Sequence, residues 1–255
     1  MIETVEQNLV EFFRHFARHR PSGRIEELDG VSIASCGIDF HMFNAAFFSA
    51  PVTAAEGDLE RRIDLAAGHL GVQGGRWAFW ACEDRLDKSI AGRASKAFGR
   101  RDLFLTLRHP GMVSTGLKPP RRPLPQLEIR PIEDRQSRLA VAHINSVAFR
   151  IPFEWCLELY DIEALWGGAF SGYIGRVNGE AVSTAATLAA AGTVGVYCVA
   201  TLPGHERKGY AETMVRHAVA RAGQGQSILQ ATSPGFSLYR RMGYEVVTHF
   251  AIYST

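Results

Sequence analysis

A proline-rich stretch near the middle of the chain sets the strongest limit on its fold. Four prolines fall within residues 116–126 (GLKPPRRPLPQ), at Pro119, Pro120, Pro123 and Pro125. Proline fixes φ and lacks the backbone N–H, so neither a regular helix nor a central strand can run through this stretch. The chain has 255 residues, which is long for one domain and short for two large ones. We therefore predict two domains, residues 1–115 and 127–255, joined by a linker over residues 116–126.

Composition and charge exclude several classes of protein. Hydrophobic residues make up 46% of the chain and charged residues 21%, which is typical of a globular protein with a real core. Lysine and arginine number 28 against 26 acidic residues, and a net charge of +2 gives no reason to expect a nucleic-acid or acidic-membrane partner. Residues 181–200 carry no charge, but their Ala, Thr, Ser and Gly content favours two strands joined by a tight turn over a membrane span.

The cysteines and the N-terminal sequence indicate a cytoplasmic protein. No CxxC pair occurs, so the sequence supports neither a zinc site nor a disulfide framework, and we expect reduced, buried thiols and no metal. Acidic residues precede any apolar run at the N-terminus, which is unlike a secretory signal peptide. The four cysteines are Cys36, Cys82, Cys156 and Cys198.

The order of predicted elements indicates an α+β fold with a mixed sheet. In the second half we expect a strand at 127–132, a helix capped by Asp134, a second helical stretch over 153–170, and three strands separated by Asn178-Gly179 and Ala191-Gly192. A helix at 207–222, a strand at 227–232, a short helix at 236–242 and a last strand at 244–253 follow. The first half predicts helices at 5–19, 58–70 (N-cap Asp58) and 89–98, with strands within 31–48, near 77–80 and at 102–107.

The segment VYCVATLPGHERKGYAE, residues 196–212, carries the chemistry. An apolar strand runs into a turn and then into the N-terminus of a helix, where unpaired backbone N–H groups bind anions, above all phosphates. Gly209 and Ala211 allow a phosphate to approach the backbone closely, and Arg207 and Lys208 add positive charge. Neither the Walker pattern nor the dinucleotide fingerprint is present.

This segment resembles the pyrophosphate-binding signature of the GNAT superfamily of acyl-CoA N-acyltransferases, [RQ]-x-x-G-x-[GA]. The six positions are residues 206–211, and the first departs from the pattern because Glu206 replaces Arg or Gln. Residues 228–247 (ILQATSPGFSLYRRMGYEVV) resemble the second signature of the family, with Gly243 ending a short helix. The resemblance covers about residues 127–255 and implies a GNAT fold there. The first half, with its early strands, the helix at 58–70, a strand, a helix and a strand before HPGM, separately resembles the reduced N-terminal domain of two-domain GNAT proteins.

The resemblance also implies a set of site residues. Acetyl-CoA would be the co-substrate, and its pantetheine arm would lie against the strand that precedes the loop. The backbone N–H of Val199 or Ala200 would donate to the oxyanion. Tyr239 matches the general acid of the family, although an aromatic residue of the core is the alternative. The residues implied to bind the co-substrate are Cys198, Val199, Ala200, Arg207, Lys208, Gly209, Tyr210 and Ala211.

The acceptor side is less defined by the sequence. Glu154 and Trp155 belong to a segment that falls where the variable substrate-binding helices of the family lie, and this segment could equally be core. By residue type and rough location, Glu154, Asp161, Glu163 and Glu180 are candidates for the general base, but a solvated surface carboxylate is the favoured interpretation of each.

Two functional hypotheses follow from these observations. The first is an N-acetyltransferase that transfers the acetyl group to a primary amine, on a small molecule in preference to a protein, by direct attack in a ternary complex. The second is a non-catalytic protein that binds or senses CoA, for which Glu206 is the clue. Residues 1–115 carry no motif and would hold determinants of substrate choice or the contacts of a homodimer, both of which stay open.

Overall fold

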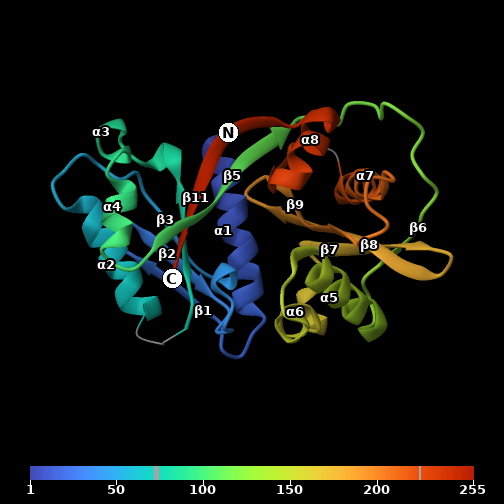
Figure 1. Ribbon diagram of the computed structural model, residues 1–255, viewed down its shortest axis with the longest axis horizontal. Helices are drawn as coiled ribbons and strands as arrows, with labels where there is room; N and C mark the ends of the chain where they lie inside the picture. The colour runs from blue at the N-terminus through green and yellow to red at the C-terminus, as the bar shows by residue number, and fades with distance from the viewer. Residues whose placement is uncertain (72–74, 224) are drawn as a thin grey trace. The chain divides into compact units, whose positions relative to one another are not determined.

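The computed structural model describes residues 1–71, 75–223 and 225–255, and the chain divides into two compact units (Figure 1). Unit 1 comprises Met1–Gly111 and Val246–Thr255, and unit 2 comprises Met112–Glu245. The predicted boundaries place the last strand in the second half of the chain. In the structure the chain passes from unit 1 to unit 2 within one strand, β5 (Phe104–Ser114), and returns to unit 1 within its last strand, β11 (Glu245–Ser254).

Unit 1 is built on a mixed sheet with the strand order β1-β2-β3-β4-β11. The strands β1, β2 and β3 are antiparallel, β4 is parallel to β3, and β11 is antiparallel to β4. The elements are α1 (Ile2–Arg18), β1 (Arg24–Leu28), β2 (Val31–Ser35), η1 (His41–Phe43), β3 (Asn44–Phe48), α2 (Asp58–Leu70), β4 (Ala78–Cys82), η3 (Glu83–Arg85), α3 (Lys88–Ala91), α4 (Ala94–Gly99), β5 (Phe104–Ser114) and β11 (Glu245–Ser254).

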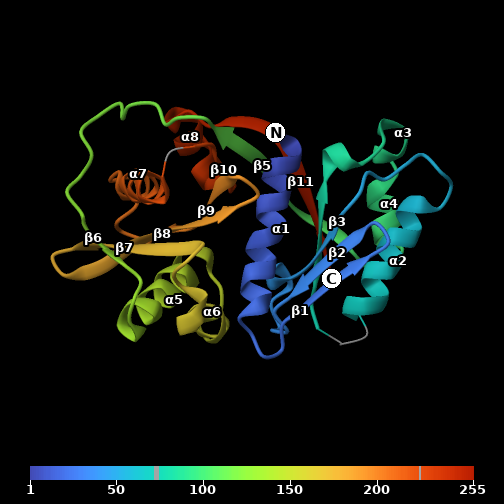
Figure 2. The ribbon, with the colours of Figure 1, turned by 180° about the vertical axis from the view of Figure 1, so that it is seen from behind.

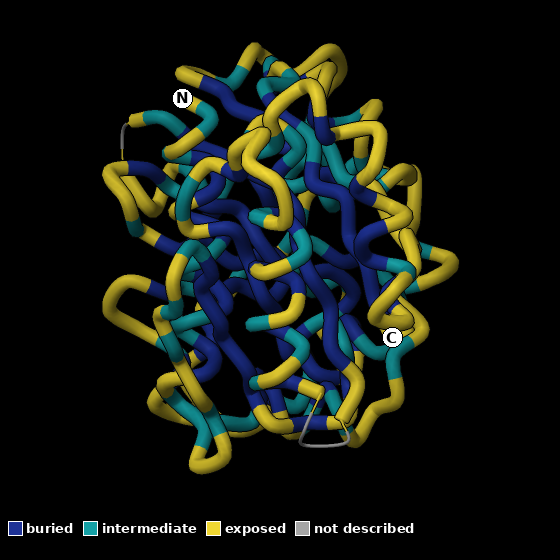
Figure 3. Tube along the Cα trace, turned by 90° about the vertical axis from the view of Figure 1, so that its left-hand side faces the viewer, coloured by how far each residue is buried: buried dark blue, intermediate teal, exposed yellow. Residues whose placement is uncertain are grey.

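The core of unit 1 lies on both faces of its sheet, because successive side chains of a strand point to opposite faces. On one face, Phe13 of α1 packs against Phe47 and Trp80, with ring centroids 5.3 and 5.2 Å apart. On the other face, Phe48 and Phe79 belong to the cluster that includes buried residues of α2 and α4. Every residue of β3 and β4 is therefore buried, and Figure 3 shows the strands as buried tube within more exposed loops.

Unit 2 has a sheet with the strand order β10-β9-β8-β7-β6, in which β10 is parallel to β9 and the other pairs are antiparallel. Helices α5 and α6 lie on one side of this sheet and α7 on the other (Figure 2). The elements are β6 (Glu128–Pro131), α5 (Arg135–Phe149), α6 (Phe153–Tyr160), η4 (Glu163–Leu165), β7 (Phe170–Val177), β8 (Glu180–Ala190), β9 (Thr193–Thr201), α7 (Tyr210–Ala222), β10 (Ser227–Gln230) and α8 (Ser233–Met242).

Local chemistry confirms several predictions in unit 2. Both residues of the turn Asn178-Gly179 and both residues of Ala191-Gly192 have positive φ, as two-residue hairpin turns of type I′ require. Asp134 caps α5 by accepting from the backbone N–H of Ser137 at 2.7 Å.

Three predictions in unit 1 are corrected. Asp58 is the first helical residue of α2 instead of its N-cap, which is Gly57 at φ +79°, because the Asp58 carboxylate accepts from the N–H and hydroxyl of Thr53 in the preceding loop. The helix predicted at 89–98 is divided into α3 and α4. The strand predicted at 102–107 continues past Pro110 to Ser114 as β5.

The two units share one order of elements. In each, three antiparallel strands are followed by a helix and by a strand parallel to the third, namely β1-β2-β3-α2-β4 in unit 1 and β7-β8-β9-α7-β10 in unit 2. The connecting helix begins after a glycine of positive φ in both, Gly57 at +79° and Gly209 at +95°. The chain thus contains two versions of one topology, and only the second carries the anion-binding signature.

Candidate active site

Strand β9 carries a bulge close to its carboxyl end. The register with β8 shifts between Tyr197 and Ala200, so that Cys198 and Val199 together stand opposite Ala185. Cys198 adopts φ +51°, in the left-handed region that few residues other than glycine occupy. A bulge redirects backbone groups that a regular ladder would use. The two predicted oxyanion donors, the N–H groups of Val199 and Ala200, therefore lie where β9 departs from its ladder.

Strands β9 and β10 are paired only near their start. Their parallel register joins Val194 to Ser227 and Gly195 to Ile228, whereas β9 continues to Thr201 and β10 to Gln230. Backbone groups beyond the last pair are not used between these two strands, and such groups need other partners. An extended ligand can supply them, which is what the resemblance implies for a pantetheine arm.

The helix that follows β9 begins with an open N-terminus. The N-cap of α7, Gly209, makes no side-chain hydrogen bond, and the first turn is closed by Thr213, which donates its backbone N–H to the Gly209 carbonyl at 3.0 Å. The N–H groups of Tyr210, Ala211 and Glu212 precede this first intrahelical donor and carry the positive end of the helix dipole. This end of α7 is therefore suited to a phosphate or pyrophosphate.

The charged residues of the loop before α7 are exposed. Arg207, at φ +58°, and Lys208 extend into solvent beside the helix N-terminus. Glu206 is also exposed, so its negative charge is screened by water and weakens anion binding little. The departure of Glu206 from the family signature is therefore compatible with the phosphate site.

The proline-rich stretch packs along unit 2. A Cβ added to Gly209 would lie 3.0 Å from Cδ of Pro125, and Arg122 donates to the Arg207 carbonyl at 3.3 Å. The N–H of Lys118 donates to the Met242 carbonyl at 2.8 Å, at the end of α8. The stretch predicted as a linker thus lies beside Gly209, bonds the loop before α7 at the Arg207 carbonyl, and bonds the end of α8.

Tyr239 lies on α8 and is 8% exposed. Burial, and next the neighbouring Tyr244 whose ring centroid is 5.9 Å away, raise the pKa of the Tyr239 phenol above its usual value of 10. The phenol is therefore protonated at neutral pH, as a general acid must be. Its predicted catalytic role stays a prediction.

Cys198 is a neutral thiol. Burial raises its pKa to about 12, and the Tyr160 hydroxyl lies 3.7 Å from its Sγ. A nucleophilic cysteine needs a lowered pKa and a positively charged neighbourhood, and neither is found here. Cys198, within the bulge, is therefore unsuited to act as a nucleophile.

The acceptor-side candidates occupy different environments. Glu154 is exposed and Trp155 half-buried, both in the first turn of α6. Asp161 follows α6 and pairs with Arg138 and Arg135, each at 3.1 Å. Burial would raise the pKa of Asp161, but these two ion pairs outweigh it and lower that pKa, which makes Asp161 a poor base. The other two base candidates, Glu163 and Glu180, are exposed.

Sequence reasoning missed several polar residues around this site. The Nδ1 atom of His205, in the loop before α7, and Nε2 of Gln230, at the end of β10, are buried without a hydrogen-bond partner in the part of the chain that the structure describes. Thr184 donates to the carbonyl of Cys198 within the bulge. No local pattern marks these residues, because each acquires its environment only when the strands come together.

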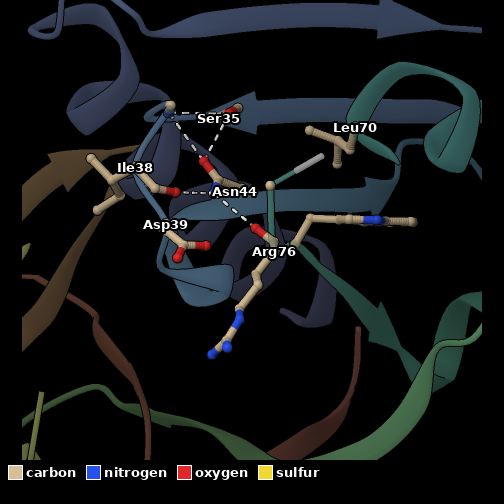
Figure 4. A pocket seen from close by; sticks show the side chains of 9 residues that line it. Ser35, Ile38, Asp39, Asn44, Leu70 and Arg76 are labelled. Carbon is tan, nitrogen blue, oxygen red and sulfur yellow. Dashed lines mark hydrogen bonds between the residues drawn. The ribbon is translucent and has the colours of Figure 1, made fainter. Parts of the chain in front are cut away.

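Unit 1 contains a separate pocket of about 360 Å³ at the carboxyl end of β2 (Figure 4). The Asn44 amide at its floor accepts from the Ser35 hydroxyl at 2.8 Å and donates to the carbonyls of Ile38 and Arg76 at 2.6 and 2.9 Å. These buried polar groups satisfy one another. The pocket is lined by Ser35, Gly37, Ile38, Asp39, Asn44, Leu70, Gly75, Arg76 and Trp77.

Two further kinds of feature are absent from the described residues. Residues 1–71, 75–223 and 225–255 contain no group of three or more His, Cys, Asp or Glu side chains placed to hold a metal ion. Within these same ranges, no helix has the length and apolar character needed to cross a membrane.

Comparison with known proteins agrees with the geometry of unit 2. Residues 173–247, from β7 to the start of β11, match the family described as "Acetyltransferase (GNAT) domain". This range contains the bulge, the loop, α7 and Tyr239. A search of curated proteins gives no match.

Solved structures resemble the chain over nearly its whole length. A GCN5-related N-acetyltransferase from Kribbella flavida superposes with a TM-score of 0.72 at 16% identity, covering 99% of this chain and 94% of that one. A functionally unknown conserved protein from Staphylococcus epidermidis gives 0.65 at 12% identity, with 91% and 94% covered. A GCN5-related N-acetyltransferase from Sphaerobacter thermophilus gives 0.57 at 14% identity, with 89% and 76% covered.

These likenesses confirm the predicted fold class, including the GNAT-like N-terminal half, which carries no motif of its own. The family match adds the acyl-transfer domain itself, over the strands, loop and helix described above. The chain therefore carries a GNAT acetyltransferase domain at residues 173–247 within the two-part fold of GCN5-related N-acetyltransferases.

Proposed function

We propose that the protein transfers the acetyl group of acetyl-CoA to a primary amine of a small molecule, by direct attack in a ternary complex. The observation that carries this proposal is the combination in unit 2 of a bulged β9 with the open N-terminus of α7, both inside the matched GNAT range. The bulge supplies a donor for a developing oxyanion and the helix supplies donors for a pyrophosphate. Each half of acetyl-CoA thus has a counterpart in one continuous segment.

The binding role falls to backbone groups. The N–H groups of residues 210–212 would donate to the pyrophosphate, and Arg207 and Lys208 would neutralise its charge. Val199 or Ala200 would donate to the thioester oxygen as it becomes an oxyanion, and such a preorganised donor is worth about 100- to 1,000-fold in kcat. Because these donors are main-chain atoms, side-chain changes in the loop alter affinity more than chemistry.

Tyr239 would complete the reaction as general acid. The amine nitrogen bonds to the thioester carbonyl carbon, the carbon–sulfur bond breaks, and the departing thiolate takes the phenolic proton of Tyr239. The ammonium formed on the acceptor loses a proton to a base that we leave unassigned among Glu154, Glu163, Glu180 and water. Burial of Tyr239 keeps its proton in place until the thiolate forms.

Direct transfer is favoured over a covalent acyl-enzyme. Cys198 is the cysteine within the bulge, and its pKa of about 12 leaves almost no thiolate at neutral pH. Glu154 and Trp155 on α6 remain our candidates for contacts with the acceptor.

The four cysteines are free, which supports our proposal of a reducing, cytoplasmic compartment.

Two measurements on the whole protein test the proposal. Thermal unfolding with acetyl-CoA, CoA and ATP should give a raised melting temperature with the first two only, since a ligand that binds the native state stabilises it by RT ln(1+[L]/Kd). Release of CoA from acetyl-CoA, followed with a thiol reagent across a panel of primary amines, should then identify an acceptor.

The outcomes separate the competing hypotheses. If neither acetyl-CoA nor CoA raises the melting temperature, the proposed acyl-CoA site is refuted. Binding of CoA without turnover on any amine would favour the non-catalytic binding or sensing protein suggested by Glu206. Turnover restricted to protein or peptide amines would correct the acceptor class and keep the reaction.

A further inference from the structure

A chain of buried hydrogen bonds runs from helix α5 through strand β8 to the bulge of β9. Asn145 of α5 donates from Nδ2 to the Thr184 hydroxyl oxygen at 3.3 Å, and the Thr184 hydroxyl donates to the Cys198 carbonyl at 2.7 Å. Asn145 and Thr184 are both 0% exposed. No sequence motif contains either residue, and neither has a part in the proposed reaction.

The direction of each hydrogen bond is fixed. Asn145 Nδ2 also donates to the Val141 carbonyl at 2.9 Å, and that carbonyl can only accept, so the amide must present Nδ2 on this side. The Thr184 oxygen accepts from Asn145, and its single proton is therefore free to point to Cys198. Asn145 and Thr184 together therefore supply one hydrogen-bond donor to the Cys198 carbonyl within the bulge.

The planarity of the peptide bond carries this constraint to the neighbouring N–H. The Cys198 carbonyl and the Val199 N–H belong to one trans peptide group, in which C=O and N–H point in opposite directions. Holding the carbonyl toward Thr184 on β8 therefore turns the Val199 N–H away from β8. That side of β9 is the one on which the pairing with β10 ends at Gly195.

We propose that Thr184, oriented by Asn145, is a positioning residue that directs the Val199 N–H into the opening between β9 and β10, and that Val199 instead of Ala200 is the oxyanion donor. This inference rests on the proposed acetyl transfer and specifies it further. Ala200 stands opposite Thr184 in the ladder with β8, whereas Val199 lies within the bulge. Ser183, the residue before Thr184, bonds the Ala200 carbonyl at 2.8 Å, and this carbonyl belongs to the peptide group that carries the Thr201 N–H.

The test compares three substitutions on β8 in the full chain. Thr184→Val keeps the shape and removes the hydroxyl, and Thr184→Ser restores the hydroxyl. Thr187→Val is the matched control, because Thr187 is a buried threonine of the same strand that lies opposite Val196, before the bulge. Two readouts are used, steady-state kinetics with acetyl-CoA and the ¹⁵N–¹H spectrum of the ligand-free protein.

The kinetic arm separates positioning from general loss of structure. A donor moved by a fraction of an ångström loses its contact with the transition state, whereas substrate binding is retained. We therefore expect Thr184→Val to lower kcat about 10- to 100-fold, with KM for acetyl-CoA changed less than about twofold. Thr184→Ser should recover most of the lost kcat, and Thr187→Val should stay near wild type. Equal kcat in Thr184→Val and Thr187→Val, or no recovery in Thr184→Ser, would overturn the role of Thr184.

The spectroscopic arm needs no turnover and so separates this inference from the proposed function. We expect Thr184→Val to shift the Val199 amide resonance and speed its hydrogen exchange, while the Tyr197 amide changes little. An unchanged Val199 amide would overturn the assignment even if acetyl transfer is found. If Thr184→Val shifts the Val199 amide resonance but the protein acetylates no amine, the orientation of the bulge by Thr184 is supported and only its role in catalysis is refuted.

Discussion

Gly209 offers the most direct test of the anion site, through the substitution Gly209→Ala. The residue has φ +95°, and a Cβ there would lie 3.0 Å from Cδ of Pro125. A left-handed backbone costs about 1–2 kcal/mol for a residue with a Cβ, and the contact with Pro125 requires the proline or the loop to move as well. Relief of both strains displaces the N–H groups that follow at residues 210–212.

The structure supplies a matched control in unit 1. Gly57 begins α2 at φ +79°, and a Cβ there would meet no atom within 4 Å. Gly57→Ala therefore carries the same kind of backbone strain without a steric contact and away from unit 2. Both variants should unfold at lower temperature than wild type, Gly209→Ala by the larger amount.

The affinity for CoA measures whether Gly209→Ala displaces these N–H groups. A charge-assisted hydrogen bond is worth about 1.5–3 kcal/mol, so the loss of one N–H to the pyrophosphate should weaken CoA binding about 10- to 100-fold. Calorimetric titration of Gly209→Ala should show this loss for CoA and little change for pantetheine, which lacks the pyrophosphate. The reasoning is refuted if Gly209→Ala binds CoA as Gly57→Ala does, or if pantetheine loses affinity equally.

Four further predictions follow. Tyr239→Phe should lower kcat at least about 100-fold with KM for acetyl-CoA unchanged, and an unchanged kcat removes the general acid. Cys198 should react with iodoacetamide at pH 8 far more slowly than glutathione, because its pKa is about 12, as peptide mass spectrometry can check. Because the pKa of Asp161 is lowered in the folded protein, its ion pair with Arg138 stabilises the fold above the unfolded pKa, and this stabilisation is lost as the pH falls through the folded pKa. Urea unfolding should therefore show Arg138→Met to be less stable than wild type at pH 7, with a smaller difference at pH 3. A fragment of residues 127–255 should aggregate, because it retains β11 without β4, and a soluble, folded fragment would contradict the assigned pairing.

The parts of the fold that depend on neighbouring residues could be predicted from the sequence. Asn178-Gly179 and Ala191-Gly192 form the expected hairpins because their backbone preferences are local. Asp134 caps α5, and Gly243 ends α8 at φ +101°, for the same reason. The order of strand, loop and helix around residues 196–212 also followed from local pattern, and it located the candidate site.

The parts that depend on distant partners could not be predicted. Asp58 is drawn from the expected N-cap position into α2 by Thr53, a contact that depends on how the loop before the helix folds back on it. The bulge at Cys198 is a property of two paired strands, and its support by Asn145 becomes visible only when α5 packs on the sheet. The final strand has the composition of any buried strand, and its partner β4 precedes the whole of unit 2.

The return of the chain to unit 1 has a mechanical consequence. Both chain ends belong to unit 1, and unit 2 is attached to it at two points, within β5 and within β11. Traction applied at the two termini therefore loads unit 1 first, and the C-terminal end pulls on the five residue pairs between β11 and β4, from Ser254↔Ala78 to Phe250↔Cys82. Because β11 lies between β4 and β5 in the sheet, unit 2 is loaded through β11 only after this strand has separated from both neighbours.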